Sequence, residues 1–279
     1  WSADQYTKFE DERTRPVRDL LAALPAIEAR IAIDIGCGPG NSTELLAARF
    51  PGASVRGIDN SADMIAAAQR RLPGLRFDLE DINRWIDRHA AKSAAIDAEI
   101  GVIDAEMDVI DAEIDVILAN AVLQWLPDHA RVFPALVAKL APGGGLAVQM
   151  PDNLDEPAHR LMREIAADGP WAGKLAAAAA TMRPSMGAAD WYYGLLRSSG
   201  CKADVWRTTY YHALAGGAEA IVEWFKGSGL RPFIAPLDDD ERMKFLERYR
   251  EAVARAYPAL PDGSVLLPFP RLFIVAHAV

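Results

Sequence analysis

The chain has 279 residues, 51% of them hydrophobic, with a formal net charge of −9 and two cysteines, Cys37 and Cys201. This composition argues against large-scale disorder, a disulfide framework and a membrane span, because core-forming residues are ample, cysteines are few and no apolar run reaches about 18 residues. It also argues against a nucleic-acid partner, since phosphate binding needs clustered lysine and arginine, and a cytoplasmic location is the expectation.

The first half alternates β-branched runs with amphipathic stretches, which is typical of a parallel sheet covered on both faces. Helices are predicted over 41–50, 61–71 and 128–140, with Ser61 and Asp128 as N-caps. The last of these helices is expected to end before Pro142 and the glycines at 143–145. Strands are predicted over 30–35, 54–58, 75–79, 114–118 and 145–149.

The second half is less regular. Helices are expected near 156–168, 188–199 and 217–257, the last interrupted at 227–236, with strands near 203–211 and 271–276. Two late strands with a long helical segment between them suggest an antiparallel edge that carries a helical lid over about 212–264, which 1–25 would complete. The sequence therefore predicts one α/β domain over 1–279, a doubly wound, mostly parallel seven-stranded sheet with an antiparallel last strand and a helical lid.

An internal repeat with a period of seven, AEIGVID, AEMDVID and AEIDVIL, runs through 98–118. Residues 96–115 contain eight acidic side chains and no basic one. Two interpretations stay open. The segment from about 88 to 113 is either an acidic surface insertion or a partner-binding helix, since a sustained seven-residue period can form a coiled-coil seam.

The segment IAIDIGCGPGN at 31–41 brings Asp34 and three glycines to the end of a strand and the start of a helix. Glycines there let the backbone turn tightly and approach a ligand closely. The spacing is GxGxG rather than GxGxxG, which argues against a nicotinamide dinucleotide. Asp59 ends the second predicted strand, 19 residues after Gly40, where a carboxylate can accept both hydroxyls of a ribose.

This pair resembles the class I S-adenosylmethionine-dependent methyltransferases, whose first motif reads as DIGCGPG does at 34–40. The resemblance implies S-adenosyl-L-methionine as cofactor and S-adenosylhomocysteine as product. Three of the implied residues also suit structural roles: Met64 in the core, Cys37 as a small packed side chain and Asp81 as a helix cap. The implied cofactor-binding residues are Asp34, Gly36, Cys37, Gly38, Gly40, Asp59, Asn60, Met64, Asp81, Ile82, Asn120, Ala121 and Gln124.

Six further segments are similar to the trans-aconitate methyltransferase family, in order and over nearly the whole chain. They are QYTKFEDERTRP (5–16), NAVLQWLPDH (120–129), LAVQMPDN (146–153), VWRTTYYH (205–212), GLRPF (229–233) and FPRLFIVA (269–276), whereas the repeat and the alanine-rich 172–180 depart from the family pattern. The resemblance implies methyl-ester formation on trans-aconitate or a similar small polycarboxylic acid. Arginines suit such an acceptor because a guanidinium holds a carboxylate through two parallel hydrogen bonds. The substrate-binding residues that we expect are Tyr6, Phe9, Arg13, Arg207, Tyr210, Tyr211, Arg231 and Arg271.

No catalytic acid or base is assigned, because a carboxylate is already ionised at pH 7 and alignment of the reactants supplies the catalysis. His129 and His212 are expected to be structural hydrogen-bonding residues, and no residue cluster suggests a metal. Two alternatives remain. The acceptor is another small acid or a carrier-bound acyl thioester, or the chain is a non-catalytic cofactor-binding module. The oligomeric state is left open.

Overall fold

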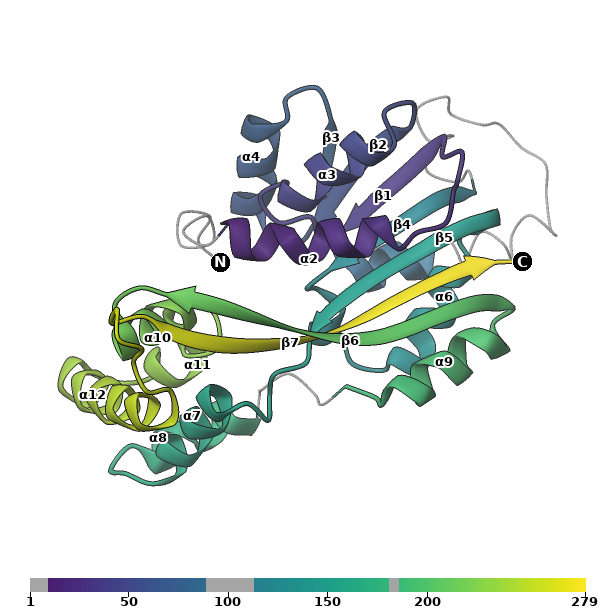
Figure 1. Cartoon of the computed structure of the whole chain (residues 1–279). Helices are drawn as coiled ribbons and strands as arrows, with labels where there is room; N and C mark the ends of the chain where they lie inside the picture. The colour runs from purple at the N-terminus through teal and green to yellow at the C-terminus, as the bar shows by residue number, and fades with distance from the viewer. Residues whose placement is uncertain (1–9, 89–112, 181–185) are drawn as a thin grey trace.

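Figure 1 shows the computed structural model, which describes residues 10–88, 113–180 and 186–279. Its centre is a seven-stranded sheet in the order β3-β2-β1-β4-β5-β7-β6. Strands β1 to β5 pair in parallel, whereas β7 is antiparallel to both β5 and β6. The predicted α/β class and antiparallel last strand are confirmed. The strands are β1 (Ile31–Ile35), β2 (Ser54–Asp59), β3 (Arg76–Leu79), β4 (Ile114–Asn120), β5 (Leu140–Pro151), β6 (Cys201–Leu214) and β7 (Val265–Ala278).

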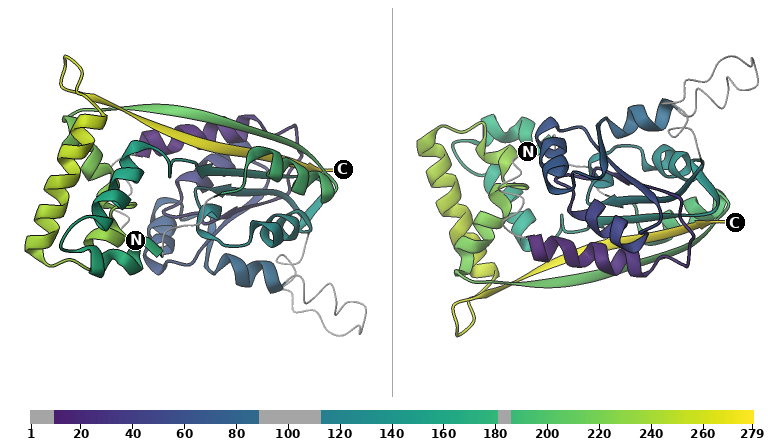
Figure 2. Two further views of the ribbon diagram at one scale, coloured as in Figure 1. Left: turned by 90° about the horizontal axis from the view of Figure 1, so that it is seen from below. Right: turned by 90° about the horizontal axis from the view of Figure 1, so that it is seen from above.

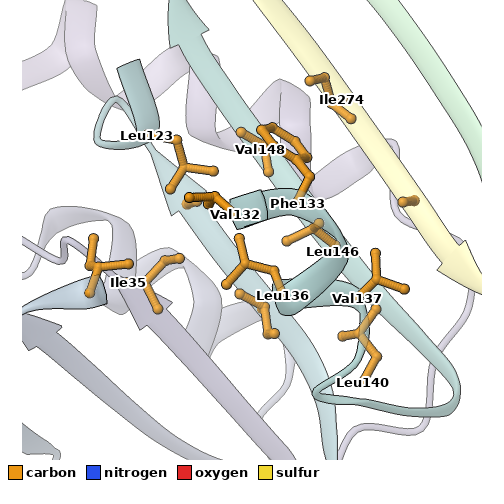
Figure 3. Packing of buried hydrophobic residues seen from close by; sticks show 14 of the residues in the cluster. Ile35, Leu123, Val132, Phe133, Leu136, Val137, Leu140, Leu146, Val148 and Ile274 are labelled. Atoms are coloured by element: carbon orange, nitrogen blue, oxygen red, sulfur yellow. The ribbon is translucent and has the colours of Figure 1, made fainter. Parts of the chain in front are cut away.

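Helices cover both faces of the sheet, as the buried central strands require. On one face, α2 (Glu10–Ala22) and α3 (Asn41–Arg49) pack against β1, β4 and β5, and α4 (Ala62–Arg71) packs beside β3. On the other face lie a helix over 82–88, α6 (His129–Val137) and α9 (Ala189–Ser198). Figure 3 shows this second core, where Val132, Phe133 and Leu136 of α6 face Leu146 and Val148 of β5.

The segment after α6 differs from the prediction. Helix α6 ends at Val137, and β5 already begins at Leu140, so Pro142 and the three glycines lie inside a strand. The pairing of β5 with β4 shifts register between Ile114 and Val116, and a Cβ atom at Gly144 would lie 3.0 Å from the carbonyl oxygen of Ile114. The glycine therefore permits a close backbone approach in an irregular strand pair, where the sequence predicted only the end of a helix.

Among the described residues, five helices form a separate lobe on the far halves of β6 and β7 (Figures 1 and 2). Its core contains Leu214 of β6 and Val265, Leu267 and Phe269 of β7, so the two long strands join the lobe to the sheet. The expected lid of 212–264 covers only part of this lobe, which also includes two helices preceding β6. The helices are α7 (Pro157–Ala167), α8 (Ala172–Ala180), α10 (Gly217–Lys226), α11 (Arg231–Ile234) and α12 (Asp239–Ala256).

The N-terminal helix α2 lies on the sheet rather than among these five helices. Val17, Leu20 and Leu21 are buried with Ala147 of β5 and Phe273 of β7. Residues 1–9 and most of the heptad repeat lie outside the described residues, while the end of the third repeat copy forms β4. Within the described ranges, no helix has the length and apolar character to cross a membrane.

Candidate active site

The glycine loop between β1 and α3 is tied to the end of β2. The backbone N–H groups of Gly36 and Cys37 donate to the carbonyl oxygen of Ile58, over 2.8 and 3.0 Å. Gly36, Gly38 and Gly40 have φ angles of 70°, 53° and 93°, in the left-handed region that glycine adopts without strain. The loop conformation therefore depends on glycine at these three positions.

Asp34, near the end of β1, stabilises this loop through hydrogen bonds to α3. Its side chain is fully buried, and Oδ2 accepts hydrogen bonds from the hydroxyls of Ser42 and Thr43, both at 2.7 Å. Burial raises the pKa of Asp34 to about 7, although the two hydroxyl donors act in the opposite direction. These bonds join the end of β1 to the first turn of α3.

Asp59 lies at the end of β2 and faces the loop. Its Oδ2 accepts from the backbone N–H of Gly38 at 3.0 Å, and its Oδ1 accepts from that of Ser61 at 2.9 Å. Burial raises the pKa of this carboxyl, while the backbone donors lower it. Each carboxylate oxygen retains a further lone pair, so Asp59 is able to accept additional hydrogen bonds from a ligand.

A pocket of about 320 Å³ opens between Asp59 and the segment after β4. Nine of the thirteen expected cofactor residues line it, together with three that the sequence reasoning did not assign: Val122, Trp125 and Leu126. These three belong to the family-like segment NAVLQWLPDH (120–129). Their position directly after the fourth strand could have identified them as pocket residues. The nine are Gly36, Gly38, Asp59, Asn60, Met64, Asp81, Ile82, Asn120 and Ala121.

The other four expected cofactor residues do not line this pocket, although Cys37 lines a small recess next to it. Besides Asp34, Cys37 is buried beneath Gly57, where an added Cβ would lie 2.8 Å from its Sγ, and burial raises the pKa of its thiol. Gly40 is the N-cap of α3. Gln124 donates from Nε2 to the carbonyl oxygen of Ala121 at 2.6 Å, and Ala121 has a φ of 54°. Asp81 both lines the pocket and caps the 82–88 helix by accepting from the N–H of Arg84.

The pocket suits a charged nucleoside such as S-adenosylmethionine. Met64, Ile82 and Leu126 are apolar walls for a flat base, and the Asp59 carboxylate suits a ribose diol. A small recess next to the pocket shares Gly36, Gly38 and Asn120 with it. Among the described residues, the buried Oδ1 atoms of Asn41 and Asn120 in this recess have no hydrogen-bond partner. Such acceptors suit the ammonium group of the methionine moiety.

Arg271 is buried at the junction of the sheet and the helical lobe, with 4% of its surface exposed. Its Nη1 donates to Oε1 of Gln149 at 2.9 Å, and its guanidinium carbon lies 4.6 Å from the ring centroid of Phe269 in the lobe core. The carbonyl oxygen of Gln149 in turn accepts from the N–H of Ala121 at 2.8 Å. Gln149 therefore connects Arg271 to Ala121 in the wall of the pocket.

The structure separates Arg207, another expected acceptor residue, from Arg271. Register pairs Thr208 with Arg271 and Arg207 with Leu272, so the two arginines point to opposite faces of the β6–β7 ladder. Arg207 forms an ion pair with Asp152 at 2.9 Å.

The remaining expected acceptor residues occupy three kinds of position. Tyr210 donates from its hydroxyl to Asp19 of α2 at 2.6 Å, whereas Tyr211 is 66% exposed. Arg231 is exposed at the start of α11. Tyr6, Phe9 and the side chain of Arg13 lie outside the described part of the chain.

His129 and His212 both contact other residues of the protein. His129 contacts the hydroxyl of Tyr192 through Nδ1 at 2.6 Å and the carbonyl oxygen of Leu123 through Nε2 at 2.8 Å. His212 stacks on Trp224 with ring centroids 4.8 Å apart. Over 10–88, 113–180 and 186–279, no group of three or more His, Cys, Asp or Glu side chains is arranged to hold a metal ion.

Comparisons with known proteins agree with this geometry. A methyltransferase-domain family model matches residues 33–146. The chain is 52% identical to a trans-aconitate 2-methyltransferase of Methylobacterium nodulans, over 99% of this chain and 98% of that relative. It is 50% identical to the enzyme of the same name from Rhizobium meliloti, over 99% and 98%. The solved structure of the YcgJ protein from Bacillus subtilis shares the fold, with a TM-score of 0.55 at 11% identity, over 95% of this chain and 98% of that one. The chain belongs to the trans-aconitate 2-methyltransferase family.

Proposed function

We propose that this chain transfers the methyl group of S-adenosylmethionine to a carboxylate oxygen of trans-aconitate. The products are a methyl ester and S-adenosylhomocysteine. The relatives named trans-aconitate 2-methyltransferase support the acceptor, and they match nearly the whole chain rather than the cofactor domain alone. The single structural observation that carries the proposal is the connection from Arg271 through Gln149 to Ala121 in the pocket wall.

The reaction needs alignment rather than proton transfer. The S-adenosylmethionine sulfonium makes its methyl carbon electrophilic. An ionised acceptor carboxylate attacks this carbon as the bond from carbon to sulfur breaks, and the electron pair of that bond stays on sulfur. Because the carboxylate carries no proton at neutral pH, no general base is required. Holding the reactants in line accounts for about 7–11 kcal/mol of barrier lowering in favourable cases.

The proposal gives each part of the site a role. Asp59, Asn60, Met64, Asp81 and Ile82 hold the nucleoside. The glycine loop and Asn120 hold the methionine moiety, with Ala121 beside the methyl group. Arg271 binds one acceptor carboxylate, because its buried guanidinium supplies several donors in a fixed plane.

The helical lobe is proposed as the acceptor lid. Phe269 belongs to the lobe core and also lies under the Arg271 guanidinium, so the lobe and the acceptor anchor share a contact. The formal charge of −9 argues against a nucleic-acid acceptor, because phosphate binding needs clustered lysine and arginine.

The test is methyl transfer from labelled S-adenosylmethionine to trans-aconitate, cis-aconitate, citrate, isocitrate and an acyl-carrier thioester. We expect base-labile ester label on trans-aconitate in preference to the other acids. Preferred transfer to the thioester would replace the acceptor and leave the methyltransferase assignment standing. Binding of S-adenosylhomocysteine without transfer to any acceptor would contradict the proposed reaction.

A further inference from the structure

Gln149 is a fully buried polar residue at the carboxyl end of β5. It pairs in parallel with Asn120 of β4 and in antiparallel with Phe273 of β7. Residues that are directly opposite in a ladder point to the same face, so the Gln149 side chain shares a face with Asn120. Asn120 lines the cofactor pocket, so Gln149 lies one strand away from a pocket residue on the same face of the sheet.

The orientation of the Gln149 amide is determined by its neighbour. Arg271 has only donors, so the atom that faces its Nη1 at 2.9 Å has to be the amide oxygen. The NH₂ group of the amide consequently points away from the guanidinium. Within the described residues this buried Nε2 atom has no hydrogen-bond partner.

A buried amide nitrogen without a partner is rare in folded proteins, because its desolvation is then uncompensated. The neighbouring Asn120 Oδ1 is a buried acceptor that also has no partner among the described residues. This donor and this acceptor lie on adjacent strands and do not bond each other. The pair suits two separate ligand groups, a cation at Asn120 and an anion at Gln149.

We infer that Gln149 is a second binding residue for the acceptor: its Nε2 donates to an acceptor carboxylate while its Oε1 holds Arg271 in place for the same anion. The inference rests on the proposed function, since it deepens the acceptor half of that site. The backbone of Gln149 is bonded to Ala121, so the carboxylate bound by its side chain has a fixed position relative to the pocket wall. Gln149 thereby determines specificity for an anionic acceptor.

Two variants separate donation to the acceptor from a merely structural role. Gln149→Met keeps the length of the side chain and removes both polar atoms. Gln149→Glu keeps an oxygen for Arg271, removes the donor and adds a negative charge. The measurements are the Kd of trans-aconitate for protein saturated with S-adenosylhomocysteine, the Kd of S-adenosylhomocysteine itself, and KM and kcat for the acceptor.

We expect both variants to weaken trans-aconitate binding by about 10- to 100-fold, as for a lost hydrogen bond to a charged group, with a larger loss for Gln149→Glu. The acceptor KM should rise in parallel, whereas the S-adenosylhomocysteine Kd should stay at the wild-type value. That retained affinity also shows that the variants are folded. Gln149→Met introduces no buried charge, so the inference can still be tested with this variant if Gln149→Glu does not fold.

Wild-type acceptor affinity in Gln149→Met would overturn the inference. So would near-wild-type affinity in Gln149→Glu, because an oxygen that only positions Arg271 is retained there. Failure of the proposed function looks different, since the unmodified protein would then neither bind nor methylate trans-aconitate, and this inference would fall with it.

Discussion

A Cβ atom added to Gly36 would lie 2.3 Å from Cγ2 of Val122. Gly36 also has a φ of 70°, which costs a residue with a side chain about 1–2 kcal/mol. Gly36→Ala should therefore displace Val122 or the loop, both of which line the pocket. We expect loss of S-adenosylhomocysteine binding in calorimetry and a lower free energy of unfolding.

Gly52→Ala is the matched control, because no atom lies within 4 Å of its added Cβ. It should retain cofactor affinity and stability. If Gly36→Ala and Gly52→Ala had the same cofactor affinity and the same free energy of unfolding, the close approach of Gly36 to Val122 would not be needed for the loop conformation.

The raised pKa of Asp34 predicts a pH-dependent stability. The unfolded carboxyl ionises near its ordinary value of 3.8, whereas burial keeps the folded carboxyl protonated up to about 7. The contribution of Asp34 to the free energy of unfolding is thus fully present below pH 3.8, falls as the pH rises towards 7 and is constant above it. Between pH 5 and pH 8, this amounts to a loss of about 2–3 kcal/mol.

Asp34→Asn is the variant that isolates this effect. An asparagine oxygen still accepts from Ser42 and Thr43 but does not ionise in this range. Urea unfolding without cofactor should show the wild type losing stability relative to Asp34→Asn as the pH rises. Parallel pH profiles of the two proteins would contradict the burial of a protonated Asp34.

Asp59→Ala tests the ribose position. The substitution removes the carboxylate that lines the pocket and accepts from Gly38 and Ser61. We expect the Kd of S-adenosylhomocysteine to rise by about tenfold or more, since hydrogen bonds to a charged group contribute about 1.5–3 kcal/mol. Asp63→Ala, which removes an exposed carboxylate in the first turn of α4, should leave that Kd unchanged.

Arg271→Lys tests the acceptor anchor. A lysine keeps the charge but lacks the planar fork of a guanidinium, so one carboxylate contact is lost. The acceptor KM should rise about tenfold in steady-state kinetics, with the S-adenosylhomocysteine Kd unchanged. Arg160→Lys, at an exposed ion pair with Glu164, is the control and should behave as wild type. Equal losses of cofactor affinity in Asp59→Ala and Arg271→Lys would contradict the assignment of Asp59 to the cofactor and of Arg271 to the acceptor.

The sequence by itself determined the architecture and most of the pocket wall. The β-branched runs and the glycine loop identify parallel strands, and the carboxyl ends of such strands meet at one edge of the sheet. Asp59 after β2, Asp81 after β3 and Asn120 after β4 therefore had to converge, and in the structure they line one pocket. This inference needs only chain order and the right-handed crossover rule.

Tertiary packing decided which polar side chains face the pocket and which support it. Asp34 and Gln124 lie in the predicted motifs, yet both are buried and bond protein groups instead of lining the pocket. Asp34 accepts from Ser42 and Thr43, and Gln124 donates to Ala121. The β6–β7 register points Arg207 and Arg271 to opposite faces, and it brings Arg271 to Gln149 across 122 positions of the chain. Register and burial depend on contacts between distant segments, whereas motifs and periodicity report only local preference.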